Sequence, residues 1–128
     1  MRLAIKRIYD PKEDSDGARI LVDRIWPRGI GKDAAGLTLW LKEIAPSTAL
    51  RQWFNHDPTR WKEFCRRYHA ELDANPAAVN ALRRLMKTKK VTLLYSAKDT
   101  EHNQARALAE YLHKSSPRRP ARRTAKSR

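Results

Sequence analysis

The sequence contains a single cysteine, Cys65, in 128 residues. One cysteine excludes an intramolecular disulfide and agrees with a reducing compartment. No apolar run approaches the roughly 20 residues that a membrane-spanning helix needs. The N-terminus, MRLAIKRIYD, is interrupted by charges and lacks the apolar stretch of a signal peptide. We therefore expect a cytoplasmic protein without membrane contact.

Glycine is also scarce, and the four glycines form neither a P-loop nor the G-x-G-x-x-G motif that binds dinucleotides. The four histidines and Cys65 are scattered and make no zinc signature. A G-x-S-x-G nucleophile motif is absent as well. The sequence therefore predicts no cofactor and no metal.

Charge is plentiful, with a formal net charge of +14. Seven of these excess charges lie between Lys114 and Arg128, where there is no acidic residue and no large apolar side chain. Such a segment cannot offset the entropy cost of ordering, so we predict a disordered basic tail at 114–128 after a domain at 1–113. If all seven charges met nucleic-acid phosphates, the salt slope of binding would be about −6. A tail that only keeps the protein soluble is the alternative.

Three apolar stretches predict strands. Leu3–Tyr9 contains Leu3, Ile5 and Ile8 among basic residues, while Ala18–Ile25 and Val91–Ser96 are nearly continuous runs of aliphatic residues. Continuous runs are typical of strands that are buried on both faces. Gly29–Gly36 is predicted as a flexible loop. Leu37–Ile44 fits a helix and a strand equally well.

The remaining chain has helical periodicity and recognisable helix starts. Ser47 is a predicted N-cap, and Asp57 and Asn75 each precede a proline at the first helical position. Asp99 or Thr100 is predicted to cap the last helix. Because a strand that returns after a helical crossover is usually parallel to its neighbour, we expect an α/β fold. Its sheet is parallel at least in part, and about four to five helices cover it.

Two polar segments follow buried strands, and parallel strands would bring them to the same rim of the sheet. They are Asp23–Gly29 and Ser96–Gln104. Arginine binds phosphate or carboxylate through forked hydrogen bonds, and lysine acts as a point charge. We therefore predict an anion site, with the helix start also favouring an anion. Its predicted ligand-binding residues are Arg24, Trp26, Arg28, Ser96, Lys98 and Asn103.

His102 is the predicted general acid or base of this rim, and Asp99 is predicted to orient a neighbouring group. The alternative is structural: Arg24 pairs with an acid such as Asp23, Asp99 only caps a helix and Trp26 is core. Ser96, Asp99 and His102 contain the residue types of a hydrolytic triad, but their closeness in sequence does not predict triad geometry.

Two further residues are candidates. His56 precedes a helix and would approach the same rim from the helical layer, and a functional role and a purely structural one both stay open. Cys65 lies in the apolar stripe of its helix and is interpreted as a core residue rather than a nucleophile.

Four segments together resemble the bacterial YeaO-like family, domain of unknown function 488. They are KRIYDPKEDSDGARILVDRIWPRGI, LWLKEIAPS, WFNHDPTRW and LLYSAKDTEHNQA. The resemblance runs from about Leu3 to Leu112 and implies a small cytoplasmic α/β fold, but no established reaction, cofactor or partner. More distant relatives carry cysteines where this sequence has Ser96 and Asn103, so their thiol chemistry is not carried over.

Three functions fit these observations, and no reaction is assigned. The first is an anion-binding α/β domain for a phosphate ester or nucleotide-like small molecule, with or without enzymatic activity. The second is a nucleic-acid-associated protein that binds through the tail and the basic core. The third is a non-catalytic partner-binding domain whose polar segments only fix loops.

Overall fold

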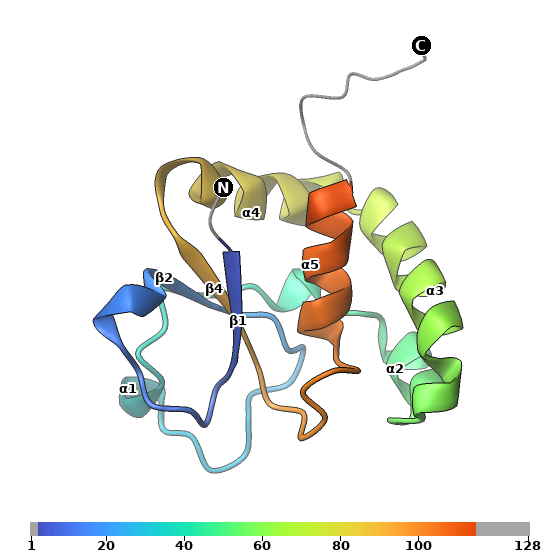
Figure 1. The fold of residues 1–128 in the computed structure, drawn as a ribbon, viewed down its shortest axis with the longest axis horizontal. Helices are drawn as coiled ribbons and strands as arrows, with labels where there is room; N and C mark the ends of the chain where they lie inside the picture. Colours follow the sequence, from blue (N-terminus) through green and yellow to red (C-terminus); the bar gives the residue numbers. More distant parts are fainter. Residues whose placement is uncertain (1–2, 115–128) are drawn as a thin grey trace.

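The computed structural model describes residues 3–114 (Figure 1). The elements follow the chain in the order β1 (Leu3–Arg7), η1 (Asp14–Asp16), β2 (Ala18–Leu21), α1 (Lys32–Ala35), β3 (Leu39–Trp40), η2 (Lys42–Ile44), α2 (Thr48–Phe54), η3 (Pro58–Arg60), α3 (Trp61–Asp73), α4 (Pro76–Thr88), β4 (Val91–Tyr95) and α5 (Gln104–Lys114), where η marks a 3-10 helix. Apart from Lys114, the predicted basic tail lies outside the described residues.

The four strands form one parallel sheet in the order β1-β4-β2-β3. Val91 of β4 is in register with Leu3 on one side and with Ala18 on the other. The predicted α/β class with a parallel sheet is therefore confirmed. Helices α2, α3 and α4 form the crossover that returns the chain from β3 to the centre of the sheet.

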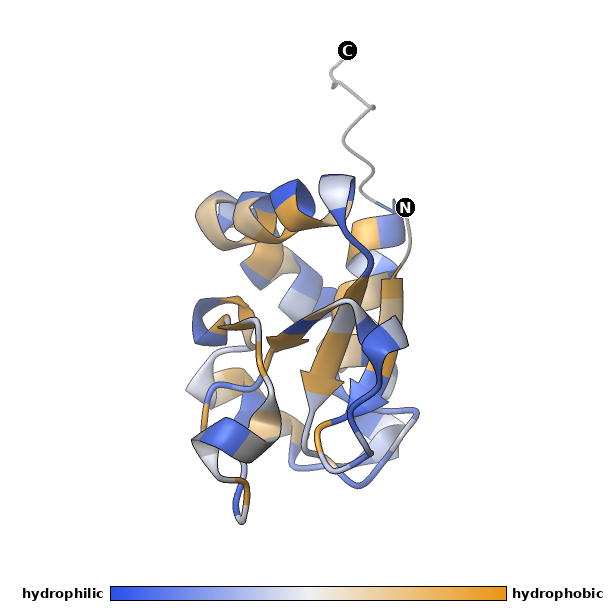
Figure 2. Cartoon of the chain, turned by 90° about the vertical axis from the view of Figure 1, so that its left-hand side faces the viewer, coloured by the Kyte–Doolittle hydropathy of each residue, from blue (hydrophilic) through white to orange (hydrophobic). Residues whose placement is uncertain are grey.

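Alternating strand residues divide the interior into two apolar clusters. Ile20 and Leu93 face the larger cluster, between the sheet and α2–α5. Leu21 and Leu94 face the smaller one, which Trp26 and Trp40 help to cover on the other side. Figure 2 shows strands with much apolar colour at the centre of the molecule. Burial on both faces explains why the two central strands read as continuous aliphatic runs.

Local cap signals predicted two of the helix starts. The Ser47 hydroxyl accepts a hydrogen bond from the Leu50 N–H at 3.1 Å, as predicted for an N-cap. Asp57 accepts one from the Thr59 N–H at 3.0 Å and begins η3, which leads directly into α3. Asn75 precedes α4 as predicted, but its side chain makes no capping hydrogen bond; its amide donates to the Glu43 carbonyl at 2.9 Å.

Three segments differ from the prediction or resolve it. Strand β2 ends at Leu21 rather than at Ile25, so Asp23 and its neighbours belong to a loop. The stretch Gly29–Gly36 contains the short helix α1. The ambiguous stretch Leu37–Ile44 divides into the two-residue strand β3 and the single turn η2. Across residues 3–114, none of the helices is both long and apolar enough to cross a membrane.

Candidate functional site

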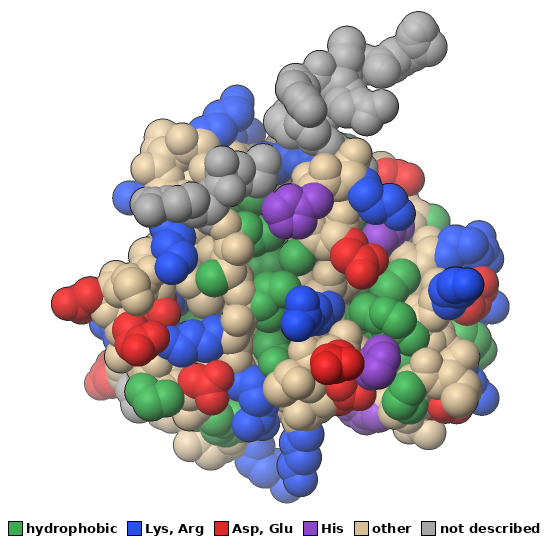
Figure 3. Space-filling model, viewed as in Figure 1, with side chains coloured by type: hydrophobic (Ala, Val, Ile, Leu, Met, Phe, Trp, Pro, Cys, Tyr) green, Lys and Arg blue, Asp and Glu red, His purple; other side chains and the backbone are tan. Residues whose placement is uncertain are grey.

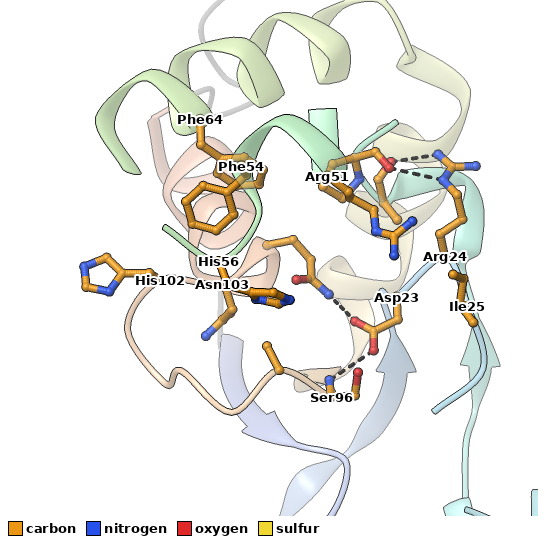
Figure 4. Close-up of a pocket in the computed structure, with 14 residues that line it drawn as sticks. Asp23, Arg24, Ile25, Arg51, Phe54, His56, Phe64, Ser96, His102 and Asn103 are labelled. Carbon is orange, nitrogen blue, oxygen red and sulfur yellow. Dashed lines mark hydrogen bonds between the residues drawn. The ribbon is translucent and has the colours of Figure 1, made fainter. Parts of the chain in front are cut away.

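A pocket of about 200 Å³ opens where β2 and β4 end (Figure 4). The loop after β2 forms one wall, the chain entering and leaving α2 forms the second, and the loop from β4 to α5 forms the third. Its lining residues are Asp23, Arg24, Ile25, Ala45, Pro46, Arg51, Phe54, His56, Phe64, Ser96, Ala97, His102, Asn103 and Gln104. The pocket therefore lies at the carboxyl ends of parallel strands, where the sequence places the candidate site.

Asp23 is a buried carboxylate at the base of this pocket, with 6% of its surface exposed. It accepts hydrogen bonds from the backbone N–H of Ser96 at 3.0 Å and from the side-chain amide of Gln104. Burial raises the pKa of Asp23, and the hydrogen bonds from Ser96, the charge of Arg51 and the bond from Gln104 oppose that rise. Asp23 thus ties the end of β2 to the end of β4 and to α5.

Arg51 enters the pocket from α2 and points toward Asp23 (Figure 4). Its charge acts on the Asp23 carboxylate, but its side chain makes neither a hydrogen bond nor an ion pair within the described part of the chain. The side chain is only partly exposed. Arg51 is therefore a partly desolvated cation whose donors are available.

Arg24 also lines the pocket, but its donors are engaged in holding the backbone. Its Nε donates to the Pro46 carbonyl at 3.1 Å and its Nη2 donates to the Ala45 carbonyl at 3.0 Å. These bonds fix the chain that leads into α2, and therefore help to place Arg51.

Aromatic rings form the apolar wall of the pocket. The centroids of Phe54 and Phe64 lie 4.4 Å apart, and the Trp61 ring stacks behind Phe64 at 5.7 Å. Phe54 is the last residue of α2 and Phe64 is in the first turn of α3, so the short link between these helices holds both rings at the pocket.

His56 reaches the pocket through an unusual backbone. Asn55 has a φ of 49° and His56 a φ of 54°, so two consecutive residues adopt the left-handed conformation that non-glycine residues rarely adopt. Asn55 ends α2, whereas His56 forms no part of a regular element. Local strain of this kind is concentrated at functional sites in proteins.

Asp99 and His102 form a close pair on the loop before α5. The Asp99 Oδ2 and His102 Nδ1 atoms are 3.0 Å apart, and Asp99 Oδ1 accepts from the N–H groups of Glu101 and His102. Bonds from the backbone of Glu101 and His102 and from the His102 side chain lower the pKa of Asp99. The His102 ring packs edge-on against Trp61 at the outer side of the pocket, away from Asp23 (Figure 4).

The predicted cap of the last helix was wrong, because α5 begins at Gln104 rather than after Asp99 or Thr100. The buried Asn103 is its cap: Oδ1 accepts from the Arg106 N–H at 3.0 Å, and Nδ2 donates to the Asp99 carbonyl at 2.9 Å. His102 therefore precedes the helix instead of lying in its first turn.

The structure brings together five of the eight predicted site residues, namely Arg24, Ser96, Asp99, His102 and Asn103, with Asp99 reaching the pocket through His102. Arg28 and Lys98 are exposed and do not line the pocket. Trp26 packs against Trp40 in the smaller core, and its Nε1 donates to the Ile30 carbonyl at 2.7 Å.

Sequence reasoning missed the central pair of the pocket. The sequence indicates Asp23 only as an ion-pair partner of Arg24, includes Gln104 in a polar segment without a role, and gives no indication of Arg51. An acid directly after a buried strand was a usable signal for Asp23. Arg51 gave no such signal, since its position depends on how α2 packs beside the sheet. Among residues 3–114, no group of three or more His, Cys, Asp and Glu side chains could hold a metal ion.

Comparison with known proteins shows that the chain belongs to an uncharacterised family. A family model described as "Inactive DUF488-N3 subclade" matches residues 2–128. The chain is 47% identical to the uncharacterised protein YeaO of Escherichia coli K12 over 112 residues, which cover 88% of this chain and 97% of that relative. It is 40% identical to the uncharacterised proteins Rv3073c of Mycobacterium tuberculosis H37Rv and Mb3100c of Mycobacterium bovis, covering 88% of this chain and 94% of each relative. No solved structure matches significantly.

Proposed function

Because the chain belongs to the YeaO-like DUF488 family, and the family model that it matches is described as inactive, we propose that it is a non-catalytic binding domain for a small anionic ligand. The observation that carries the proposal is Arg51, a partly buried residue that lines the pocket and whose guanidinium has no hydrogen-bond or ion-pair partner in the described residues. A ligand anion would supply that partner.

The guanidinium suits a carboxylate or phosphate group because its donors match two oxygens at once. Asp23 does not take this role: the charge of Arg51 acts on its carboxylate, but neither a hydrogen bond nor an ion pair joins the two side chains in the described residues. Arg51 is also partly withdrawn from water, which strengthens a charge-assisted hydrogen bond relative to one on the surface. The anion therefore binds between Arg51 and the mouth of the pocket.

The other walls of the pocket indicate which groups the rest of the ligand should carry. Phe54 and Phe64 offer a flat apolar surface, and Asp23 has lone pairs left for a ligand N–H or O–H group. The volume of about 200 Å³ is below the range of roughly 300–1,000 Å³ that is usual for drug-sized ligands. A small phosphate ester or carboxylate with one ring fits better than a whole nucleotide.

Two observations support binding without catalysis. The matching subclade is described as inactive. The positions that resemble the cysteine sites of distant relatives are Ser96 and Asn103, and here the Ser96 N–H holds Asp23 while Asn103 caps α5. The nucleic-acid alternative relies mainly on 114–128, and the partner-binding alternative leaves Arg51 unexplained.

The test is a thermal-shift and calorimetric screen of inorganic phosphate, small phosphate monoesters and aromatic carboxylates. Arg51→Ala is compared with Arg28→Ala and Lys98→Ala, which each remove one positive charge outside the pocket. We expect an anion that stabilises the wild type and both controls, with affinity at least tenfold lower in R51A, since a charged hydrogen bond contributes about 1.5–3 kcal/mol.

Equal affinity in R51A and the wild type would refute this site, and so would the absence of binding across the whole panel. A greater loss in R28A or K98A would instead support the anion site expected from the sequence. Incubation of bound phosphate monoesters, followed by phosphorus NMR, should show no turnover; release of phosphate would contradict the non-catalytic assignment.

A further inference from the structure

The two edges of the sheet differ. Strand β3 forms one edge with only two residues, whereas β1 forms the other with five. Short edge strands resist pairing with other chains, but a longer edge offers a row of backbone donors and acceptors. The outer side of β1 is therefore the place in this sheet where a further strand would add.

The hydrogen bonds around β1 show which backbone groups face outward. Ile8 donates to the Tyr95 carbonyl at 2.8 Å, so the even-numbered residues of β1 face β4 and the odd-numbered residues face outward. The outward groups of Arg7 are already used, since its N–H donates to Asp10 Oδ2 at 3.3 Å and its carbonyl accepts from the Asp10 N–H at 3.1 Å. Within residues 3–114, the outward N–H and C=O groups of Leu3 and Ile5 have no hydrogen-bond partner, so a further strand could pair with them.

A groove of about 670 Å³ runs beside this edge, between β1 and α5. Leu3, Ile5 and Ala109 contribute an apolar floor, and Arg106 and Glu110 of α5 border it. The space-filling view shows apolar side chains exposed in a hollow at the centre of this face (Figure 3). Neither charged side chain of β1 guards the edge. Asp16 and Glu13 hold Lys6 at 2.9 Å and 3.1 Å, and Arg7 donates to the Ala97 carbonyl at 2.9 Å and the Ser96 carbonyl at 3.2 Å.

We propose that β1 pairs in antiparallel fashion with β1 of a second copy of this chain. The free groups fix the register: Leu3 of each copy lies opposite Ile5 of the other, and the two-fold axis passes between the two Ala4 residues. This arrangement forms four backbone hydrogen bonds and leaves the Arg7–Asp10 bonds intact. Leu3 and Ile5 of both copies then lie on the same face, between the two α5 helices.

Charge favours a second copy over an unrelated peptide. Helix α5 runs antiparallel to β1, so Arg106 lies toward the Arg7 end of the strand and Glu110 toward the Leu3 end (Figure 1). A two-fold axis reverses this order, and Arg106 of one copy therefore faces Glu110 of the other. Both side chains are exposed, and Glu110 makes no ion pair within the described residues. The surface is thus complementary to itself.

This interface is separate from the proposed ligand pocket, because none of its residues lines that pocket. Loss of dimerisation and loss of anion binding are consequently distinguishable outcomes. The prediction concerns the full chain in solution and does not depend on the ligand.

Sedimentation velocity over a range of concentrations tests the proposal. We expect the wild type to dimerise, Arg106→Glu and Glu110→Arg each to weaken dimerisation by about tenfold or more, and the double variant R106E/E110R to restore it. A wild type that stays monomeric throughout would overturn the proposal. Dimerisation that all three variants retain unchanged would assign the dimer to a different surface.

A disulfide tests the register. Residues opposite each other in a non-hydrogen-bonded antiparallel pair have Cα atoms about 4.5 Å apart, within the range that a disulfide spans. Ala4→Cys in a Cys65→Ser background should therefore form a covalent dimer on mild oxidation. Leu39→Cys on the opposite edge, in the same background, is the control and should remain largely monomeric. Equal cross-linking of the two variants would contradict the proposed register.

Discussion

The side chain of Gln104 donates a hydrogen bond to the carboxylate of Asp23, and so joins the first residue of α5 to the loop after β2. Asp23 also accepts from Ser96 at the end of β4. The buried carboxylate of Asp23 thus links three segments: its own loop after β2, the end of β4 and the start of α5. Asp23 therefore holds two walls of the pocket together, the loop after β2 and the segment from β4 to α5.

Gln104→Glu should destabilise the protein by about 2 kcal/mol or more at neutral pH, because it places a second carboxylate against a buried one. The loss should shrink in acid, where the two carboxylates share a proton. Denaturant unfolding at pH 7 and pH 5 measures both effects. Gln104→Met, which removes the bond without adding charge, should cost less and depend less on pH; identical behaviour of the two variants would contradict this account.

Anion binding should strengthen as the pH falls through the raised pKa of Asp23. Burial raises that pKa, and an anion beside Arg51 favours the protonated, neutral form of the nearby Asp23 carboxyl group. Sulfate is a suitable probe because its charge is constant over this range. His56 and His102 also line the pocket, so Asp23→Asn is the control: the part of the pH dependence that it removes belongs to Asp23. An unchanged profile in D23N would refute the linkage.

Asp16→Ala should destabilise the fold by about 3 kcal/mol, because it leaves the buried Arg19 guanidinium without its carboxylate partner at 2.5 Å. Burial acts to raise the pKa of Asp16, but bonds from the Glu13 backbone, Lys6 and Arg19 outweigh it and lower the pKa to about 2.

The stabilisation from Asp16 is therefore present above the unfolded pKa of about 3.9 and is lost as the pH falls toward 2. Urea unfolding of the wild type and Asp16→Ala across this range should show the difference between them narrowing in acid. Glu13→Ala, which removes the exposed partner of Lys6, should change stability by less than about 1 kcal/mol. A comparable loss in both variants would contradict the assigned role.

Cys65 should react slowly with iodoacetamide in the folded protein. Burial, assisted by the charge of Glu110, raises the pKa of its thiol to about 11, so little thiolate exists at pH 8. We expect alkylation, followed by mass spectrometry, to be at least about 100-fold slower in the native than in the denatured protein. Equal rates would show that the thiol is neither buried nor shifted.

Much of the architecture was predictable from local patterns. The aliphatic runs at Ala18–Leu21 and Val91–Tyr95 are strands because both faces are buried, and Ser47 and Asp57 begin helical turns because their side chains bond nearby N–H groups. Prediction was wrong where a tertiary or competing local contact intervened. The Asp99 carboxylate accepts from the N–H of Glu101 in its own loop, and helix α5 begins only after Asn103, which caps it.

The candidate site was only half predictable for a related reason. Parallel strands bring Asp23 and Ser96 together, and the sequence shows which residues follow those strands. Arg51 belongs to the helical layer, and its direction depends on the packing of α2 and on the carbonyls that hold Arg24. Arg28 and Lys98 carry the same charge as Arg51 and follow the buried strands in sequence, yet both are exposed to solvent outside the pocket. The cytoplasmic location and the nucleic-acid role of the tail stay predictions.

The position of β4 has a consequence for the order of folding. It lies between β1 and β2, yet among the described residues it is the last strand to leave the ribosome, after α4. Until it is synthesised, β1 and β2 lack their common partner, and the closure of such long loops slows folding. A nascent chain that ends before Val91 therefore carries unpaired apolar strands, and we expect truncation at α4 to yield aggregating chains rather than a smaller stable domain.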